Sequence, residues 1–249
     1  MKVELLEATD KPERLICQSA RNDYMEAFIG DTSFDTAMAE ITGETTEERK
    51  RTLITRLMDH GHFGPFEHPQ ATFAVKGISR SCMAQITRHR HASFDVQSMR
   101  YVGFEDADPE PGEAVITIPE LDDSGVCGRN GEFSDEAVEL DDDEILKVRR
   151  ETYEASIRES FESYQKLLNL GVAPENARMV LPIGTKVNMV FSVNARMLMH
   201  IVDMRAAADA QWEIREMTED ILDLGREWCP ITFEYYEEDM KNRKNRLAP

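Results

Sequence analysis

The sequence contains few cysteines: Cys17, Cys82, Cys127 and Cys229 are the only four in 249 residues, and none forms a CxxC pair. A chain of this length can bury a core without disulfides. The spacing suggests neither a disulfide framework nor a zinc knuckle. We therefore expect ordinary buried or half-buried thiols.

Long hydrophobic runs are also missing, and no stretch approaches the 18 or more apolar residues that a membrane helix needs. The N-terminus lacks a basic region followed by an apolar stretch, so we see no secretion signal. These absences predict a soluble cytoplasmic protein that does not insert into a membrane.

Lysine is scarce, with 9 lysines against 20 arginines, and the net charge is -19. Residues 105–144 hold sixteen acids and one base, Arg129. Clustered cations are needed to bind nucleic-acid phosphates, so we expect no nucleic-acid partner. Excess acid with little lysine fits a cytosol of high salt concentration, where self-repulsion is screened. A merely acidic loop is the alternative explanation.

Several ligand-binding motifs are absent. No GxGxxG follows a predicted strand, which argues against a Rossmann dinucleotide site. No Walker A or GxSxG sequence occurs either.

The pattern of apolar residues and breakers predicts one α+β domain over residues 1–249, with a central, mostly antiparallel sheet and flanking helices. Alternation predicts strands over 2–7, 70–76 and 185–193. Helical patterns cover residues 11–28, 143–170, 174–180, 194–208 and 209–228. A further helix is predicted to begin after Ser79 and to end at about residue 88. Thr45 and Glu48 form a capping box at the start of a helix that stops near Gly61. Residues 105–144 are predicted to be an exposed acidic excursion with a short extended piece at 114–118, and Gly171 is predicted to end the long helix.

The segment from Gln85 to Tyr101 carries the first chemical signal. Arg88, His89 and Arg90 stand at a predicted helix end, and a polar loop follows. Arginine is the best side chain for bidentate phosphate binding, and short hydroxyls with backbone N–H groups complete an anion cradle. A phosphorylated ligand is one interpretation, and a solvated helix end that balances nearby acids is the other.

Two further arginines, Arg178 and Arg205, lie among apolar neighbours. A desolvated arginine needs an anionic partner, which is either an acid of the protein or a bound anion. Asp203 and Asp209 are available to Arg205 as structural partners.

Five of the six histidines lie between His60 and His91. HxH patterns can bind a metal. The spacing matches no HExxH helix, however, and no cysteine joins the cluster. We therefore predict no metal site.

The string Arg88-His89-Arg90, seven residues, Ser98, one residue, Arg100 resembles the signature of the flavin-dependent thymidylate synthases. Further blocks resemble that family in the same order along most of the chain. These blocks are Ser33-Phe34-Asp35, His60-Gly61-His62, Pro65 to His68, Gln85, Ala177-Arg178, Asn194-Ala195-Arg196 and Arg205-Ala206 with Ala210 to Glu213.

This resemblance implies a homotetramer with active sites shared between subunits, FAD as cofactor, dUMP as substrate, and NADPH and 5,10-methylenetetrahydrofolate as co-substrates. The residues that it assigns to dUMP are Gln85, Ile86, Thr87, Arg88, Gln97, Ser98, Met99, Arg100, Arg178 and Arg205. The residues that it assigns to the flavin are Ser33, His62, Gly64, Glu67, Arg88, His89, Arg90, Val96, Asn194, Ala195, Arg196 and His200. Asp95, Val96 and Gly64 depart from the residues frequent in the family.

Helix geometry places Arg196 and His200 on one face, with Arg205 roughly 180° from Arg196. Such a helix can serve more than one ligand surface. Methylation at C5 of uracil by a thiolate route requires an activated cysteine, and none lies in the motif. The chain therefore looks unsuited to the thiolate route, and the family resemblance implies that reduced flavin supplies a hydride instead. We expect Arg205 to be the catalytic residue and to stabilise charge on the uracil ring. Ser98 then positions the nucleotide.

Two alternatives remain at this point. One is a histidine-cluster metal hydrolase of nucleotides. The other is an acidic flavin- or nucleotide-binding protein without turnover.

Overall fold

A computed structural model describes residues 1–104, 111–123 and 140–241. The chain forms two compact units. The first unit comprises Met1–Lys76, Ala84–Asp95 and Met189–Pro249, and the second comprises Gly77–Met83 and Val96–Asn188. The described fold is α+β, as the sequence predicts.

Four strands make one antiparallel sheet in the order β1-β2-β4-β3. Their bounds are β1 Lys2–Ala8, β2 Gln70–Ser79, β3 Ser93–Val96 and β4 Lys186–Asn194. The alternating segments 2–7, 70–76 and 185–193 correctly predicted β1, β2 and β4. Residues 93–96 were wrongly expected to lie in a loop. This strand is only four residues long, so its polar–apolar alternation is too short to predict a strand, and its place in the sheet depends on pairing with β4.

Phenylalanines from three strands make one ladder on the buried side of the sheet in the first unit. The ring centroids of Phe73 on β2 and Phe191 on β4 are 5.3 Å apart, and those of Phe191 and Phe94 on β3 are 5.8 Å apart. On the other side, the hydroxyls of Thr72 and Ser192 are hydrogen-bonded at 2.8 Å. Aromatic cross-strand pairs of this kind fix the register between strands.

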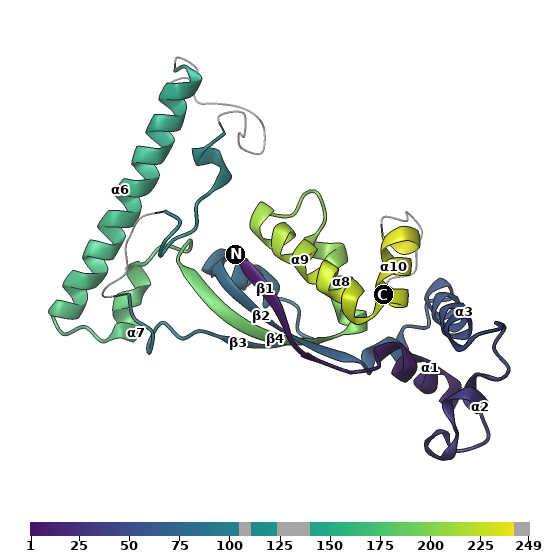
Figure 1. The fold of residues 1–249 in the computed structure, drawn as a ribbon. Coiled ribbons are helices and arrows are strands. Elements are labelled where there is room, and N and C mark those ends of the chain that lie inside the picture. Colours follow the sequence, from purple (N-terminus) through teal and green to yellow (C-terminus); the bar gives the residue numbers. More distant parts are fainter. Residues whose placement is uncertain (105–110, 124–139, 242–249) are drawn as a thin grey trace. The chain divides into compact units, whose positions relative to one another are not determined.

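Helices complete the first unit, and Figure 1 shows α8 and α9 side by side next to β1. Their bounds are α1 Pro12–Asn22, α2 Phe34–Met38, α3 Thr46–Asp59, α8 Ala195–Arg205, α9 Trp212–Trp228 and α10 Pro230–Tyr235, with short helical turns at Ile29–Asp31, Gly64–Glu67 and Tyr236–Met240. The expected helix 11–28 runs six residues past the observed end of α1 at Asn22. Beyond the buried pair Ala20 and Arg21, Tyr24 and Phe28 are exposed, so nothing packs against a longer helix.

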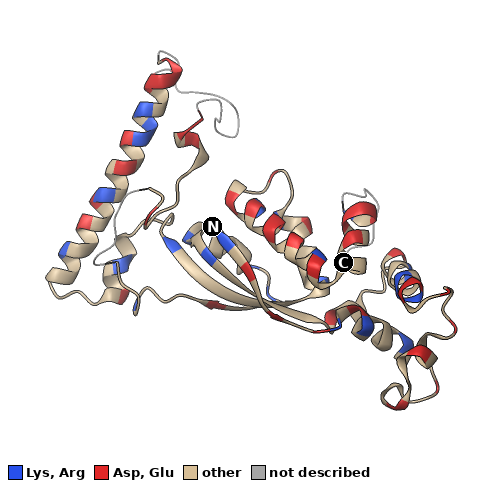
Figure 2. Cartoon of the chain, viewed as in Figure 1, with Lys and Arg blue, Asp and Glu red and all other residues tan. Residues whose placement is uncertain are grey.

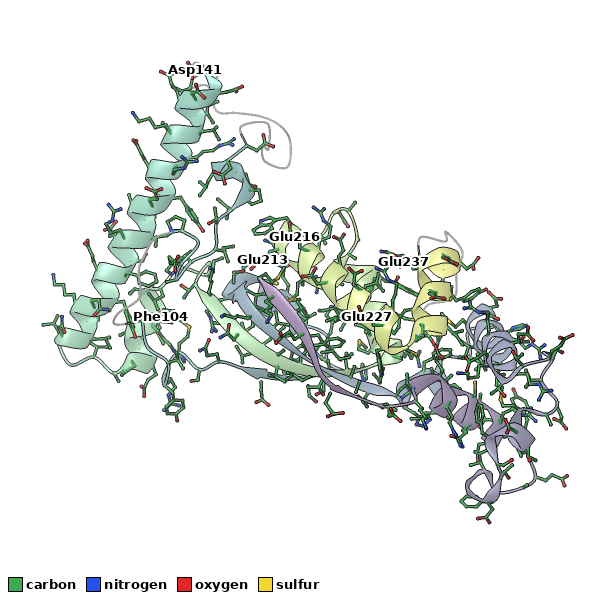
Figure 3. The ribbon with its side chains drawn as sticks, in the orientation of Figure 1. Phe104, Asp141, Glu213, Glu216, Glu227 and Glu237 are labelled. Carbon is green, nitrogen blue, oxygen red and sulfur yellow. The ribbon has the colours of Figure 1, made fainter. Side chains whose placement is uncertain are left out.

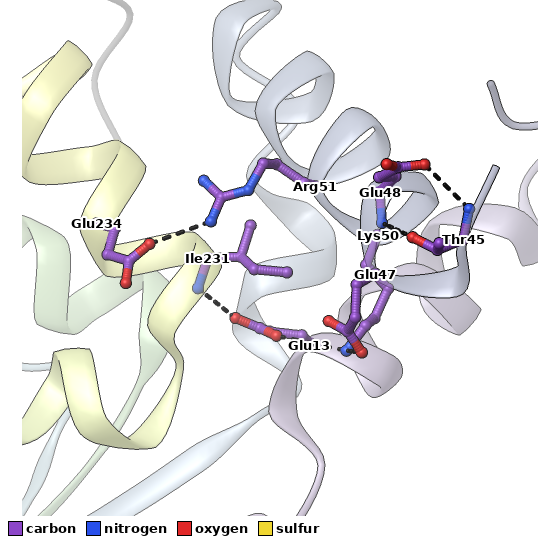
Figure 4. A network of polar contacts seen from close by, with 8 residues as sticks. All are labelled: Glu13, Thr45, Glu47, Glu48, Lys50, Arg51, Ile231 and Glu234. Carbon is purple, nitrogen blue, oxygen red and sulfur yellow. Dashed lines mark hydrogen bonds and ion pairs between the residues drawn. The ribbon is translucent and has the colours of Figure 1, made fainter. Parts of the chain in front are cut away.

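Polar contacts fix the ends of these helices (Figure 4). The capping box is confirmed: the Thr45 hydroxyl accepts from the Glu48 N–H at 3.2 Å, and the Glu48 carboxylate accepts from the Thr45 N–H at 3.0 Å. These backbone hydrogen bonds lower the pKa of Glu48. The buried carboxylate of Glu13 accepts from the N–H of Ile231 in the first turn of α10 at 2.6 Å. Burial raises the pKa of Glu13 despite this bond.

The second unit is organised around the long helix α6, Asp142–Asn169. Its apolar cluster is Val115, Ile157 and Phe161, and Phe104 packs edge-on against Phe161 at 6.1 Å. Figure 3 marks Phe104 and the N-cap Asp141, whose side chain accepts from the Glu144 N–H at 2.9 Å. Gly171 follows the C-cap with φ 83°, which confirms the predicted helix end because this backbone region favours glycine.

Shorter elements complete the second unit: α4 Arg80–Ile86, which also enters the first unit, a turn at Pro119–Leu121, α7 Pro174–Ala177 and a turn at Arg178–Val180. Ser79 caps α4 as predicted, since its hydroxyl accepts from the Cys82 N–H at 2.9 Å. The helix ends at Ile86 rather than near residue 88.

Much of the acidic excursion lies outside the described residues, including Cys127 and Arg129. Within its described part, Val115 makes bridges to Pro111 and Thr185, in agreement with the extended piece expected at 114–118. Figure 2 shows that acidic residues also occur along the helices of both units. Across the part of the chain that the structure describes, we find no helix of the length and apolarity required to cross a membrane.

Candidate functional site: an arginine centre and a polar cavity

Arg205 ends α8 and lies at the centre of a hydrogen-bonded group in the first unit. Its Nε donates to His89 Nε2 at 3.0 Å, and its Nη2 donates to the main-chain oxygen of Gln85 at 3.0 Å. The side-chain amide of Gln85 in turn donates to Gln211 Oε1 at 3.3 Å. Two segments about 120 residues apart therefore meet at this guanidinium.

His89 is buried, with 6% of its surface exposed, and its ring meets that of His200 edge-on at 5.7 Å. Burial, followed by the positive charge of Arg205 and by His200, lowers the pKa of His89 to about 4. The imidazole is consequently neutral at physiological pH, and Nε2 is an acceptor because Arg205 can only donate.

Among the residues that the structure describes, no acid forms an ion pair with Arg205. Asp203, which we considered as its structural partner, instead accepts a hydrogen bond from the hydroxyl of Tyr236. Neither Asp209 nor any other described acid forms an ion pair with Arg205. The guanidinium of Arg205 is half-buried, and its two hydrogen-bond partners are neutral. Such a group favours binding of an external anion or a polarised ligand oxygen.

A polar cavity of about 420 Å³ also lies in the first unit. Its lining residues are Glu67, His91, Asn194, Arg196, Met197 and His200. Arg196 Nη1 is 2.5 Å from Glu67 Oε1, and the Asn194 side chain caps α8 by accepting from the Met197 N–H at 2.8 Å. The volume falls within the range of small-molecule sites. Four of the predicted flavin residues therefore share one cavity: Glu67, Asn194, Arg196 and His200.

Two predicted nucleotide-binding arginines lie in the second unit, and both contact Glu175. The Arg100 Nη2 is 4.0 Å from the Glu175 carboxylate, and the Arg178 Nε donates to the Glu175 main-chain oxygen at 3.2 Å. Arg100 also lies 5.6 Å from the ring centre of Tyr101, a side chain that is 82% exposed. This group presents the exposed Arg100 next to the exposed ring of Tyr101, whereas Arg178 is half-buried.

The loop before Arg100 has an ordered backbone. The Gln97 N–H donates to the Asn188 carbonyl at 2.8 Å, and the Ser98 hydroxyl accepts from the Arg100 N–H at 3.3 Å. Met99 is buried, and its sulfur accepts from Arg80 Nη1 at 3.3 Å. In this arrangement, Met99 can reach a ligand only through its backbone atoms.

The remaining predicted site residues are dispersed over the first unit, apart from Val96, which is half-buried in the second. Ile86 and Ala195 are buried, Thr87 is half-buried, and Arg88 and Arg90 are exposed. Ser33 caps α2 by accepting from the Thr36 N–H at 3.2 Å. A Cβ added at Gly64 would meet no atom within 4 Å, so the described structure does not require glycine there.

His62 lines a different cavity, of about 290 Å³, together with His60, whose ring centroid is 6.4 Å away. Within the described residues, no three histidine, cysteine or acidic side chains are grouped to hold a metal ion. The metal-hydrolase alternative therefore gains no support from the geometry.

The sequence analysis did not place Glu175 with Arg100 and Arg178, and it did not place Gln211 with Gln85 and Arg205. Glu175 precedes Arg178 by three residues, which is a helical spacing that could have indicated contact. Gln211 caps α9 by accepting from the Ile214 N–H at 3.3 Å, and its contact with Gln85 has no signal in the local sequence.

The α+β fold, the arginine centre and the polar cavity together describe a protein with a candidate small-molecule site. Comparison with known proteins narrows this class. Residues 4–231 match the family model described as "Thymidylate synthase complementing protein". The chain belongs to this family.

Relatives named flavin-dependent thymidylate synthase come from Haloarcula marismortui, at 63% identity, and Halobacterium salinarum, at 60% identity, each with full coverage of both chains. These halophilic sources agree with the acidic, lysine-poor composition. A solved structure of a UMP/dUMP methylase, PolB from Streptomyces cacaoi bound with 5-Br dUMP, matches with a TM-score of 0.71 and 28% identity, covering 100% of this chain and 97% of that one.

Proposed function

We propose that this chain is a flavin-dependent thymidylate synthase, a methyltransferase that converts dUMP to dTMP with FAD as cofactor. NADPH and 5,10-methylenetetrahydrofolate are the proposed co-substrates. The observation that carries this proposal, beside family membership, is Arg205. Its guanidinium is half-buried and hydrogen-bonded to two neutral acceptors, so it can stabilise negative charge that develops on a ligand.

The cavity of about 420 Å³ fits the flavin role by its chemistry. Arg196 and the histidines at 91 and 200 offer a cation and planar rings, and Asn194 and Glu67 supply polar groups. In the proposed reaction, the reduced flavin supplies the hydride that completes the methyl group. We propose that Glu67, Asn194, Arg196 and His200 hold it, and that His62 and Ser33 contribute from their separate positions.

Arg205 would polarise the uracil ring as C5 gains electron density. Gln85 supports this arginine through its main-chain oxygen. Arg100 and Arg178, with Ser98, would hold the nucleotide phosphate, because guanidinium groups bind phosphate oxygens in pairs. Apart from His89, the remaining predicted residues of the dUMP and flavin sets keep the roles that the family resemblance implies.

Thiolate chemistry is unfavourable at the described cysteines. Cys17, Cys82 and Cys229 are buried. Burial raises the pKa of Cys17 to about 12 and that of Cys229 well above its usual range. A thiol in such an environment does not ionise near neutral pH, so it makes a poor nucleophile. This supports the proposed route through a hydride.

We further propose that the two units act as one thymidylate synthase domain that assembles as a homotetramer in the cytoplasm. The family match supports this proposal, because the resemblance implies a homotetramer with active sites shared between subunits. The proposal includes no nucleic-acid or membrane partner.

The purified protein should carry flavin absorbance and should form dTMP when NADPH, dUMP and methylenetetrahydrofolate are all present. The product is measured by chromatography, with each substrate omitted in turn as a control. If dUMP binds but no dTMP forms in any salt concentration up to the molar range, the alternative of a binding protein without turnover replaces this proposal.

A further inference from the structure

The guanidinium of Arg205 uses only one of its edges within the protein. Nε donates to His89 and Nη2 donates to Gln85, so both contacts lie on the side edge of the planar group. The third nitrogen, Nη1, bonds to none of the residues that the structure describes. Since a guanidinium has five N–H donors, the end edge remains available for a ligand.

The acceptor of the Nε bond is held firmly. His89 follows α4, where its N–H donates to the Ile86 carbonyl at 3.1 Å and its carbonyl accepts from Ala92 at 3.2 Å. Its ring is buried and rests edge-on against His200. A buried ring with fixed backbone contacts cannot turn freely, so Nε2 defines where the guanidinium lies.

We propose that His89 is a positioning residue for the methylation of dUMP, holding Arg205 through Nε2 so that the end edge of the guanidinium faces the substrate. This inference rests on the proposed function and assigns His89 a role different from the flavin contact that the family resemblance implies. The ring of His200 lines the polar cavity and also contacts the ring of His89. The two histidines therefore connect the cavity to Arg205.

The nature of the partner explains why histidine suits this position. A carboxylate there would neutralise Arg205 and weaken its attraction for charge on the substrate. A neutral imidazole orients the guanidinium without cancelling its charge. The low pKa of His89, about 4, keeps that acceptor unprotonated throughout the physiological range.

Three substitutions of His89 distinguish a role in orienting Arg205 from a role in packing alone. His89→Gln can place Oε1 near the position of Nε2 and so preserve the acceptor. His89→Asn places its oxygen nearer to the position of Nδ1, and His89→Phe keeps a planar ring without any acceptor. Single-turnover oxidation of reduced flavin at saturating dUMP and methylenetetrahydrofolate is measured for each, together with flavin content and melting temperature.

We expect His89→Gln to stay within about threefold of the wild-type rate, while His89→Asn and His89→Phe lose about 10- to 100-fold, as for a lost hydrogen bond to a charged group. Flavin content should stay the same in all three. In an Arg205→Ala background, His89→Phe should cause little further loss, because the two residues act as one unit.

A wild-type rate in flavin-replete His89→Phe would overturn the inference while leaving the proposed function intact. Equal loss of flavin in all three variants would also overturn it, in favour of a flavin contact. If the wild-type protein forms no dTMP, the proposed function itself fails. In that case the dUMP affinities of the same variants test the positioning role. We expect His89→Gln to bind dUMP more tightly than His89→Asn and His89→Phe, and an unchanged affinity in His89→Phe would contradict the role.

Discussion

The two arginine groups of this protein are built differently. In the first unit, Arg205 makes two hydrogen bonds of 3.0 Å to acceptors on or next to α4. In the second unit, Arg100 makes one ion pair at 4.0 Å, with about half of its side chain exposed, and Arg178 makes one bond to a nearby main-chain oxygen. The Arg205 guanidinium is therefore held by two hydrogen bonds, whereas Arg100 has only a long ion pair with Glu175 and Arg178 has one local hydrogen bond.

This contrast separates two tasks. A charge that stabilises a transition state acts best when it is oriented beforehand, because no reorganisation is then needed during the reaction. A phosphate clamp can tolerate adjustable side chains, since binding itself orders them. The structure therefore leads us to expect chemistry at Arg205 and affinity at Arg100 and Arg178.

The largest expected effect is that of Arg205→Ala. Loss of one oriented charge-stabilising donor costs about 100- to 1000-fold in rate. Arg205→Lys should recover only part of this, because lysine keeps the charge without the planar fork. The measurement is single-turnover flavin oxidation at saturating substrates.

Arg51→Ala provides a matched control for Arg205→Ala in the same unit. Arg51 is exposed and pairs with Glu234 at 3.1 Å (Figure 4), and it forms no part of the arginine centre. Its rate should equal that of the wild type. A wild-type rate in Arg205→Ala would remove Arg205 from the mechanism and abolish the contrast between the two groups.

The second prediction concerns the pH dependence of stability in the first unit. The pKa of His89 in the folded protein, about 4, lies below the unfolded value of about 6.5. As the pH falls through this window, the unfolded chain binds a proton that the folded chain does not, so the stability contribution of this site is lost. The total loss is about 3 kcal/mol by pH 4.

Urea unfolding of the wild type and of His89→Gln at pH 7, 6 and 5 isolates this contribution. The difference in free energy of unfolding between the two proteins should shift against the wild type as the pH falls. A difference that stays constant between pH 7 and 5 would show that His89 titrates normally.

The third prediction tests the second unit. Arg178→Ala and Arg100→Ala should each weaken dUMP binding by about 10- to 100-fold, the usual cost of a lost charge-assisted hydrogen bond. At saturating dUMP, the single-turnover rate should change much less. Affinities are measured by titration calorimetry. If instead the rate falls as far as in Arg205→Ala while affinity holds, the division of tasks between the two groups is wrong.

The smallest effects come from the two helix caps, one in each unit. Thr45→Ala and Asp141→Ala each remove a side-chain acceptor from a capping box, and each should cost about 1 kcal/mol. Calorimetry decides whether the units unfold together. Both substitutions should lower a single shared transition if the units behave as one domain, and two separate transitions would contradict that proposal.

Local elements were predictable because short-range patterns specify them. The capping box at Thr45, the glycine that ends α6 and the alternation in β1, β2 and β4 all depend on residues within one or two turns of each other. The wrong predictions, for β3 and for the end of α1, concern features that depend on tertiary packing. The strand β3 exists because Phe94 packs on Phe191, and α1 stops early because Tyr24 and Phe28 find no buried surface.

The sequence by itself determined the family and the candidate site residues, since the Arg88-to-Arg100 string, the separate arginines at 178 and 205 and the family match are all properties of residue order. The tertiary structure decided how each arginine is used. It paired Arg205 with a neutral imidazole and a carbonyl about 120 residues away rather than with the nearby Asp203. Contacts between distant segments form only when helices and strands pack together. No local sequence pattern specifies which of the possible packing arrangements is the most stable.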